Sequence, residues 1–135
     1  MAVNVRAVIF MTQAFIPYAR RGRRIVNLSS ISARGGYATQ SVYSASKAAV
    51  EAITRVWATE LDQKYKMTMT VNAVNTGPVD TDMYRAAGEV HLARMEEQTL
   101  KTRTENDMAK IVAFLCEERS RWITGDVVCA NGGML

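Results

Sequence analysis

A tyrosine, a lysine and a serine carry the clearest chemical signal in the sequence. Tyr43 and Lys47 are four residues apart, so on a helix they lie one turn apart on the same face. A free phenol has a pKa of about 10 and is a poor base at neutral pH, but a nearby ammonium stabilises the phenolate. Ser30 precedes Tyr43 by 13 positions and follows an apolar run, so its hydroxyl could donate a hydrogen bond to a substrate carbonyl. Together the three side chains suit proton transfer between a carbonyl and an alcohol. A tyrosine and a lysine at this spacing also occur on the exposed faces of many helices.

Alternating helices and strands are expected to position these residues. Apolar residues at helical spacing predict helices, and short β-branched runs predict strands. The predicted order is helix, strand, helix, strand, helix, helix, strand, at residues 2–20, 24–28, 41–64, 68–74, 83–100, 104–118 and 126–130. Gly22 should end the first helix, and Thr104 and Asp107 have the spacing of a capping box. The second helix carries a stripe of mostly small residues, Ala45, Ala49, Ala52, Ile53 and Val56, which would permit close packing against another helix.

This alternation predicts an α/β fold. We expect a partial Rossmann-like, doubly wound domain of three layers, in which helices flank a short parallel sheet. Ligands of such sheets bind beyond the carboxyl ends of the strands. Polar and glycine-containing segments at residues 29–30, 75–77 and 131–133 each follow a predicted strand. They should therefore converge on one rim, which would hold the functional site. The helix predicted over residues 83–100 would form a flap over a partly apolar substrate.

Composition and charge favour one small globular domain without nucleic-acid or membrane partners. The chain has 135 residues and a net charge of +4, part of it in a cluster of four arginines, Arg20, Arg21, Arg23 and Arg24. No stripe of basic and aromatic residues follows the cluster, so we interpret it as a solvated helix end. No apolar stretch is long enough to span a membrane.

The cysteines and the histidine exclude two other classes of site. Cys116 and Cys129 fall in apolar segments without metal-ligand spacing, so they are predicted to be buried free thiols in a reducing compartment. His91 is the single histidine of the sequence, which leaves little for a zinc site or a Ser-His-Asp triad. A cytoplasmic location is the expectation that follows.

Several segments together resemble a known family. They are residues 24–30 (RIVNLSS), the Tyr43–Lys47 pair, residues 71–75 (VNAVN), residues 77–81 (GPVDT), and residues 123–133, which run from Ile-Thr-Gly to Gly-Gly. Their order and spacing resemble the short-chain dehydrogenase/reductase family, in the subgroup of acyl-carrier-protein ketoreductases and sugar or steroid dehydrogenases. The resemblance extends over nearly the whole chain.

The resemblance implies a catalytic role for four residues. Tyr43 matches the acid/base of the family and Ser30 its substrate-orienting serine. Lys47 matches the lysine that stabilises the phenolate and contacts the ribose of the nicotinamide cofactor. Asn4 matches the asparagine that holds a water molecule near that lysine; without the resemblance it would be an ordinary polar residue of a helix.

The resemblance also implies NAD or NADP as cofactor. Its contacts would come from Tyr43, Lys47, Gly77, Val79 and Thr81, the last of them at the nicotinamide carboxamide. Thr81 could equally cap the helix that follows it. Gly77 leaves room for a close approach to a ligand.

The sequence departs from the family pattern at two places. Thr76 stands before Gly77 where the family usually has proline, so the turn is less rigid. None of the glycines has the spacing of a glycine-rich phosphate loop before a helix. We therefore expect residues 1–135 to be a single unit, the C-terminal half of such a Rossmann domain, and to bind NAD(P) weakly or not at all on their own.

Three functions remain open at this point. The first is NAD(P)-dependent oxidoreduction of a small carbonyl or alcohol substrate. The second is redox-neutral acid/base chemistry by Tyr43 and Lys47, such as isomerisation, dehydration or cyclisation. The third is a non-catalytic half-domain that binds a partner chain. In the family, the helices that match residues 2–20 and 41–64 pack against a second subunit, so the resemblance implies a homo-oligomer.

Overall fold

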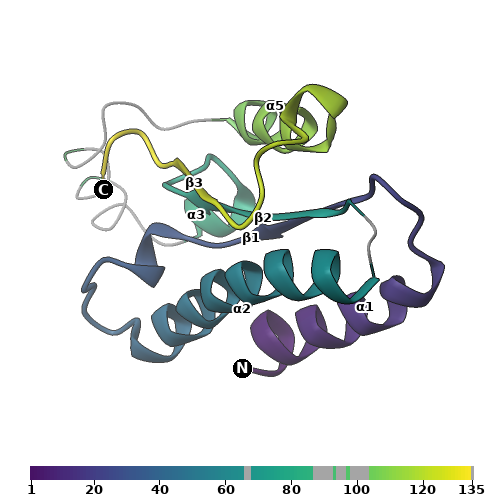
Figure 1. Cartoon of the computed structure of the whole chain (residues 1–135). Helices are drawn as coiled ribbons and strands as arrows, with labels where there is room; N and C mark the ends of the chain where they lie inside the picture. The colour runs from purple at the N-terminus through teal and green to yellow at the C-terminus, as the bar shows by residue number, and fades with distance from the viewer. Residues whose placement is uncertain (66–67, 87–92, 94–96, 98–103, 135) are drawn as a thin grey trace.

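Three parallel strands form the middle layer of the computed structural model, which describes residues 1–65, 68–86, 93, 97 and 104–134 (Figure 1). The strands are β1 (Arg24–Leu28), β2 (Thr70–Thr76) and β3 (Val127–Ala130), in the order β1-β2-β3. Ile25 lies opposite Val71 in one pair, and Ala73 lies opposite Val127 in the other. Because the strands are parallel, their carboxyl ends meet at one rim.

Helices cover both faces of this sheet. α1 (Val8–Phe15) and the long α2 (Ser41–Tyr65) lie on one face, and α5 (Glu105–Cys116) lies on the other (Figure 1). A short helix, α3 (Asp82–Arg85), follows β2. The predicted α/β fold, with a short parallel sheet between two helical layers, is therefore confirmed.

The central strand supplies much of the core. Val71, Ala73 and Val74 of β2 are fully buried, because this strand has a neighbour on each side and helices on both faces. Val71 joins a cluster with Met69 and with side chains of α2 and of the segment before β1, namely Ala19, Ala58 and Leu61. Burial of these apolar side chains fixes α2 against the sheet.

The N-terminal helix is shorter and less regular than predicted. Residues 2–20 comprise a π-helical turn η1 (Ala2–Ala7), then α1, then a 3₁₀ turn η2 (Ile16–Tyr18). Pro17 lies in that last turn and has no backbone N–H to continue an α-helical ladder. Ala19 is extended, so the helix ends before the predicted stop at Gly22.

The second strand begins and ends two residues later than predicted. Thr68 has a φ of +48°, in the left-handed region, so pairing starts only at Thr70. Asn75 and Thr76, expected to break the strand, continue it. Asn75 can remain in a buried strand because its side chain is hydrogen-bonded at both its oxygen and its nitrogen.

The remaining boundaries agree closely with the sequence. α2 and β3 differ from their predicted ranges by one residue each. The capping box of α5 is confirmed, with the Thr104 N–H donating to the Asp107 carboxylate at 3.0 Å, although the helix ends at Cys116 rather than near Glu118. Of the helix predicted over residues 83–100, α3 contains the first turn, and most of the remainder, with His91, lies outside the described residues.

Two expectations about side-chain burial are wrong. Cys116 and Cys129 are both exposed: the neighbouring Leu115 takes the inward position at the end of α5, and Cys129 lies near the end of an edge strand. Arg24 is not solvated with the rest of the arginine cluster. Its side chain is only 6% exposed and pairs with Glu118 at 3.2 Å. Within the described residues, no helix has the length and apolar character needed to cross a membrane.

Candidate active site

The three segments expected to converge do meet at the carboxyl rim of the sheet. The Asn75 side chain donates to the Ser30 carbonyl at 2.8 Å and accepts from Asn131 at 3.3 Å. The Gly77 N–H donates to the Ala130 carbonyl at 3.2 Å. The ends of all three strands are therefore connected by hydrogen bonds.

An open pocket of about 450 Å³ lies at this rim. Its wall contains five of the predicted site residues, Ser30, Tyr43, Gly77, Val79 and Thr81. Asn4 and Lys47 stand outside the wall. The fold thus brings the expected proton donor, the expected serine and the expected cofactor loop to one cavity.

Tyr43 and Lys47 lie on one face of α2, as their spacing predicts. The Lys47 ammonium lies 5.8 Å from the centre of the Tyr43 ring and donates to the Leu28 carbonyl at 2.9 Å. Partial burial lowers the pKa of Lys47 from its ordinary value, because a low-dielectric environment disfavours the charged form. The cation is held between the tyrosine and the carboxyl end of β1.

Ser30 is buried in the turn after β1. Its hydroxyl accepts a hydrogen bond from the Ser32 N–H at 3.2 Å and so caps the 3₁₀ turn η3 (Ile31–Ala33). As a donor it has, among the described residues, only a 3.4 Å contact to the Ser32 hydroxyl, which in turn donates to Gln40 at 2.6 Å. Because a hydrogen bond of that length is weak, the Ser30 proton is available for a ligand in the pocket.

Asn4 is placed beside the catalytic helix but not against the lysine. Its side-chain amide donates to the Ser46 hydroxyl at 3.1 Å, and Ser46 donates to the Tyr43 carbonyl at 2.6 Å. These bonds connect η1 to the first turns of α2. The water-holding role implied by the resemblance stays a prediction.

The segment after β2 has roles within the fold as well as in the pocket. Thr81 caps α3 by accepting the Tyr84 N–H at 3.2 Å, which is the alternative raised for it from the sequence. Gly77 does allow a close approach, but the approaching group is the chain's own backbone. A Cβ at this position would lie 2.7 Å from the Asn131 carbonyl oxygen.

The comparisons with known proteins agree with this geometry. The family model described as enoyl-(acyl carrier protein) reductase matches residues 1–135. A protein named short-chain dehydrogenase/reductase FrzI, from Cladobotryum sp, is 49% identical over 144 residues, which cover the whole chain and 55% of that relative. The chain belongs to the short-chain dehydrogenase/reductase family.

Other members of the family are similar in sequence and in structure. The L-xylo-3-hexulose reductase of Hypocrea jecorina is 40% identical over 170 residues, covering 98% of this chain and 55% of the relative. The crystal structure of an angucycline C-6 ketoreductase, LanV, with bound NADP is similar with a TM-score of 0.90 at 30% identity. The matched region covers 99% of this chain and 52% of the ketoreductase chain. The chain therefore spans about half the length of the curated relatives it matches.

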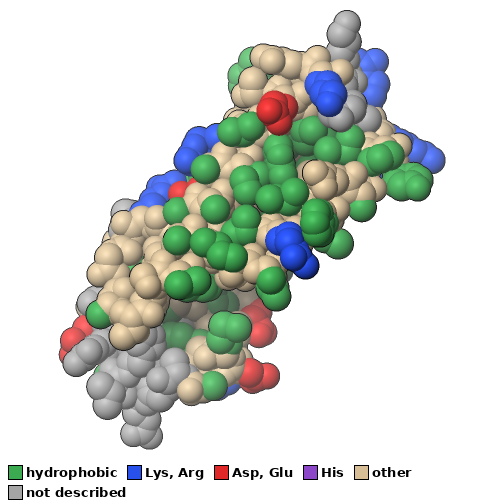
Figure 2. Space-filling view, turned by 90° about the horizontal axis from the view of Figure 1, so that it is seen from below, with side chains coloured by type: hydrophobic (Ala, Val, Ile, Leu, Met, Phe, Trp, Pro, Cys, Tyr) green, Lys and Arg blue, Asp and Glu red, His purple; other side chains and the backbone are tan. Residues whose placement is uncertain are grey.

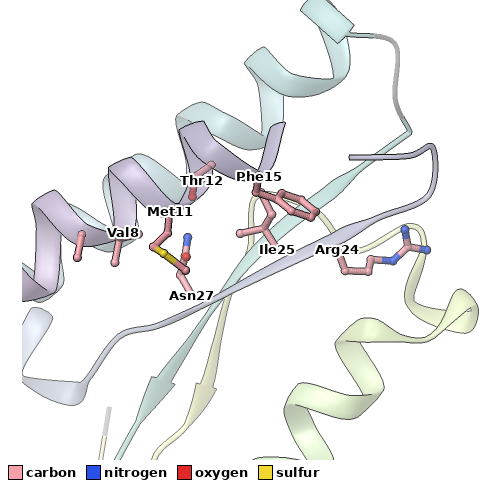
Figure 3. Close-up of a pocket in the computed structure, with 8 residues that line it drawn as sticks. Val8, Met11, Thr12, Phe15, Arg24, Ile25 and Asn27 are labelled. Atoms are coloured by element: carbon pink, nitrogen blue, oxygen red, sulfur yellow. The ribbon is translucent and has the colours of Figure 1, made fainter. Parts of the chain in front are cut away.

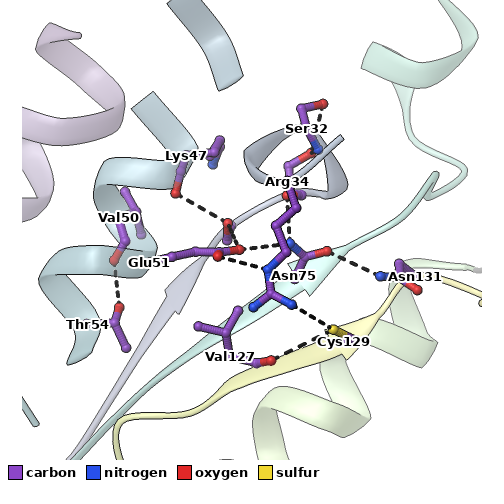
Figure 4. A network of polar contacts seen from close by, with 12 residues as sticks. Ser32, Arg34, Lys47, Val50, Glu51, Thr54, Asn75, Val127, Cys129 and Asn131 are labelled. Carbon is purple, nitrogen blue, oxygen red and sulfur yellow. Dashed lines mark hydrogen bonds and ion pairs between the residues drawn. The ribbon is translucent and has the colours of Figure 1, made fainter. Parts of the chain in front are cut away.

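The sequence assigned no individual role to two residues of this short-chain dehydrogenase/reductase site, although the first of them, Tyr84, falls in the segment that was expected to form a flap over the substrate. Tyr84 lines the pocket, and among the described residues its buried hydroxyl has no hydrogen-bond partner. Glu51 is buried one turn beyond Lys47 at the centre of a polar network (Figure 4). A glutamate on a helix usually faces solvent, so no signal in the sequence marks this one as buried.

A second pocket, of about 410 Å³, has a different character from the family's catalytic rim. It lies between α1 and β1, and its wall is mostly apolar, with Val8, Met11, Phe15 and Ile25 (Figure 3). It contains none of the predicted site residues. We therefore assign the candidate active site to the pocket at the rim, which Ser30 and Tyr43 line.

Proposed function

We propose that the chain carries the catalytic residues of an NAD(P)-dependent oxidoreductase that interconverts a small carbonyl compound and its alcohol. The observation that carries the proposal is the shared pocket of Ser30, Tyr43 and the 76–81 segment, with Lys47 held against the tyrosine. The names of the relatives support it, since they are reductases and dehydrogenases. In this proposal residues 1–135 correspond to the C-terminal half of the family's Rossmann domain.

Ser30, Tyr43 and Lys47 have separate roles in the proposed carbonyl reduction. The Ser30 hydroxyl donates a hydrogen bond to the substrate oxygen and orients the carbonyl. Tyr43 gives its phenolic proton to that oxygen as negative charge develops there. Lys47 stabilises the resulting phenolate, and its lowered pKa helps it to pass a proton onward. In the oxidation of an alcohol the same groups act in reverse.

The pocket fits the nicotinamide end of the proposed cofactor. NAD(P)H, when bound, supplies the hydride for the carbonyl carbon. Gly77, Val79 and Thr81 line the cavity that also contains Tyr43. The Tyr84 hydroxyl, which has no hydrogen-bond partner among the described residues, leaves a donor for a bound molecule. NADP is the nucleotide in the similar ketoreductase structure. We propose NAD or NADP for this protein without choosing between them.

The two alternatives from the sequence are less well supported. Redox-neutral chemistry would use the same proton donor, but none of the relatives reported above is named an isomerase, dehydratase or cyclase. A non-catalytic partner-binding half-domain does not account for the arrangement of Ser30 and Tyr43 around one cavity, with Lys47 beside the tyrosine.

Tyr43→Phe tests the proposal most directly. The change removes the transferred proton and little else, so NADPH-dependent carbonyl reduction should fall by on the order of 10²- to 10⁴-fold while the fold is unchanged. The assay uses the protein as its gene encodes it and follows NADPH absorbance with a panel of small ketones, and circular dichroism checks the fold. Tyr18→Phe is the control, because Tyr18 is 85% exposed at the end of η2.

Lys47→Ala gives a second measurement within the same experiment. Without its stabilising cation the phenolate forms less readily, so the pH dependence of turnover should move to higher pH. Wild-type turnover in Tyr43→Phe would contradict the proposed role of the tyrosine.

A further inference from the structure

The catalytic groups of the proposed reaction come from two different elements. Tyr43 and Lys47 lie in the first turns of α2, whereas Ser30 lies in the turn between β1 and η3. The substrate carbonyl would have to meet the serine and the tyrosine at once, and an error of about 1 Å in such a geometry can cost on the order of 10²-fold in rate. The rate of the proposed reaction therefore depends on the polar contacts that fix the Ser30 turn relative to α2.

Glu51 makes most of these contacts. One of its carboxylate oxygens accepts from the Ser29 hydroxyl at 2.9 Å and from the Asn75 amide at 2.8 Å (Figure 4). The other oxygen accepts from the Arg34 guanidinium at 3.1 Å. Ser29 precedes the catalytic serine, and Arg34 directly follows η3, so Glu51 holds the Ser30 turn at both ends.

Asn75 links Glu51 to Ser30 itself through its side-chain amide. Its amide nitrogen has two hydrogens, of which one goes to Glu51 and the other to the Ser30 carbonyl at 2.8 Å. Its oxygen accepts from Asn131 after β3. Because every polar atom of this fully buried amide has a partner, it cannot rotate without breaking a bond. Two hydrogen bonds thus lead from the helix of Tyr43 to the backbone of Ser30.

The charge of Glu51 is stable in this position. Burial alone would raise the pKa of Glu51, but hydrogen bonds from Asn75, Ser29 and Arg34, with the charge of Arg34, outweigh burial and lower it. The carboxylate is therefore ionised at neutral pH, and an ionised carboxylate accepts all three donors at once.

We propose that Glu51 is a positioning residue, whose carboxylate fixes the turn that carries Ser30 relative to the helix that carries Tyr43 and Lys47. It does not line the rim pocket, so its effect on turnover acts through Ser30. The catalytic part of this inference rests on the proposed carbonyl chemistry, whereas the positioning part stands on the contacts alone.

Glu51→Gln is the variant that tests the proposal. Glutamine keeps the length of the side chain but replaces one acceptor oxygen by a donor and removes the charge that pairs with Arg34. With the protein as its gene encodes it, kcat for carbonyl reduction should fall by about 10- to 100-fold. KM for NADPH should change less, because among the described residues Glu51 has no hydrogen bond to the proposed cofactor residues Gly77, Val79 and Thr81.

Thr54→Val is the matched control. Thr54 is also fully buried on α2, and its hydroxyl accepts from Asn27 and donates to the Val50 carbonyl, away from the Ser30 turn. Its loss should destabilise the fold without changing kcat. Equal losses of kcat in Glu51→Gln and Thr54→Val would overturn the proposal, because they would reveal a general effect of stability.

Hydrogen exchange provides a measurement that needs no turnover. Glu51→Gln should speed exchange of the backbone amides of residues 29–35, several of which are hydrogen-bonded within that turn, more than exchange in β2. Thr54→Val should not. If the wild-type protein reduces no carbonyl, the proposed function fails, and the exchange pattern still decides the positioning role. Unchanged or uniformly faster exchange in Glu51→Gln would overturn that role.

Discussion

Tyr84 stands out among the individual residues because its hydroxyl is buried without a partner in the described part of the chain. A buried polar group that lacks a hydrogen bond costs about 1–3 kcal/mol. Such a cost is explained when a ligand supplies the missing partner, and Tyr84 does line the candidate pocket. We infer that its hydroxyl binds a polar group of the substrate or of the cofactor.

Tyr84→Phe should therefore separate stability from binding. The unfolding free energy should stay the same or rise by about 1 kcal/mol, because an unsatisfied hydroxyl is removed. KM for the carbonyl substrate or for NADPH should rise at the same time. Urea denaturation and steady-state kinetics measure the two effects. A clear loss of stability would show that the hydroxyl already has a partner within the protein.

Residues whose role depends on one helix could be predicted from the sequence, whereas residues held by distant partners could not. The spacing of Tyr43 and Lys47 was sufficient to predict that their side chains lie close together, because residues four apart share a face of any helix. Glu51 lies four residues further along the same helix, but its burial depends on Arg34 and Asn75, which are distant in sequence. Burial of the cysteines was predicted wrongly for a similar reason, since an apolar neighbourhood in sequence does not establish burial.

Among the elements, α2 has two different faces, and the apolar pattern of the sequence identifies only the one expected to pack against another helix. In the stripe noted in the sequence, Ala45, Ala52 and Val56 are exposed, and Ala49 and Ile53 are half-buried. The face against the sheet instead includes polar residues that have partners, Ser46, Glu51 and Thr54. A pattern of apolar residues alone cannot reveal such a face, because its polar groups become compatible with burial only through hydrogen bonds across the fold.

Gly77 offers a test of how closely the ends of β2 and β3 must approach. In Gly77→Ala the new Cβ would meet the backbone of Asn131, which cannot move aside as a flexible side chain could. We expect a loss of about 1–3 kcal/mol in unfolding free energy, together with weaker cofactor binding. Chemical denaturation measures the change in stability, and NADPH titration of the protein as its gene encodes it measures the change in binding.

Gly36→Ala is the control for Gly77→Ala. A Cβ at Gly36 would have no heavy atom within 4 Å, so the change should stay within about 0.5 kcal/mol. Equal effects at the two glycines would contradict the importance of the close approach at Asn131.

For the molecule as a whole, the 135 residues contain the proposed nicotinamide-binding residues Gly77, Val79 and Thr81 but no glycine-rich phosphate loop. Phosphate charge is normally held by oriented backbone N–H groups of such a loop. We therefore expect the 135-residue chain, expressed alone, to bind NADPH with a Kd weaker than about 1 mM, a binding free energy smaller than about 4 kcal/mol. Titration calorimetry checks this, and micromolar binding would contradict it.

The outer surface predicts association of the chain with itself. Hydrophobic side chains gather over the face formed by α1 and α2 (Figure 2), where Phe10, Met11 and Val42 are more than half exposed. β1 lies at the edge of the sheet in the described part of the chain, so its outer side has backbone groups without strand partners, next to the apolar pocket of Figure 3. Soluble monomers rarely expose a large apolar surface, and open strand edges attract other chains.

We therefore expect the 135-residue chain to form a symmetric homodimer or a larger assembly, with the small residues of α2 near the contact. Ala52→Arg places a charge on this exposed face and should shift the chain toward monomer without unfolding it, because charged side chains are depleted from the cores of interfaces. Ala113→Arg on the exposed side of α5 should leave the assembly unchanged. Light scattering at micromolar concentration measures the mass. A well-dispersed wild-type monomer would contradict the prediction, as would an assembly that tolerates Ala52→Arg as well as Ala113→Arg.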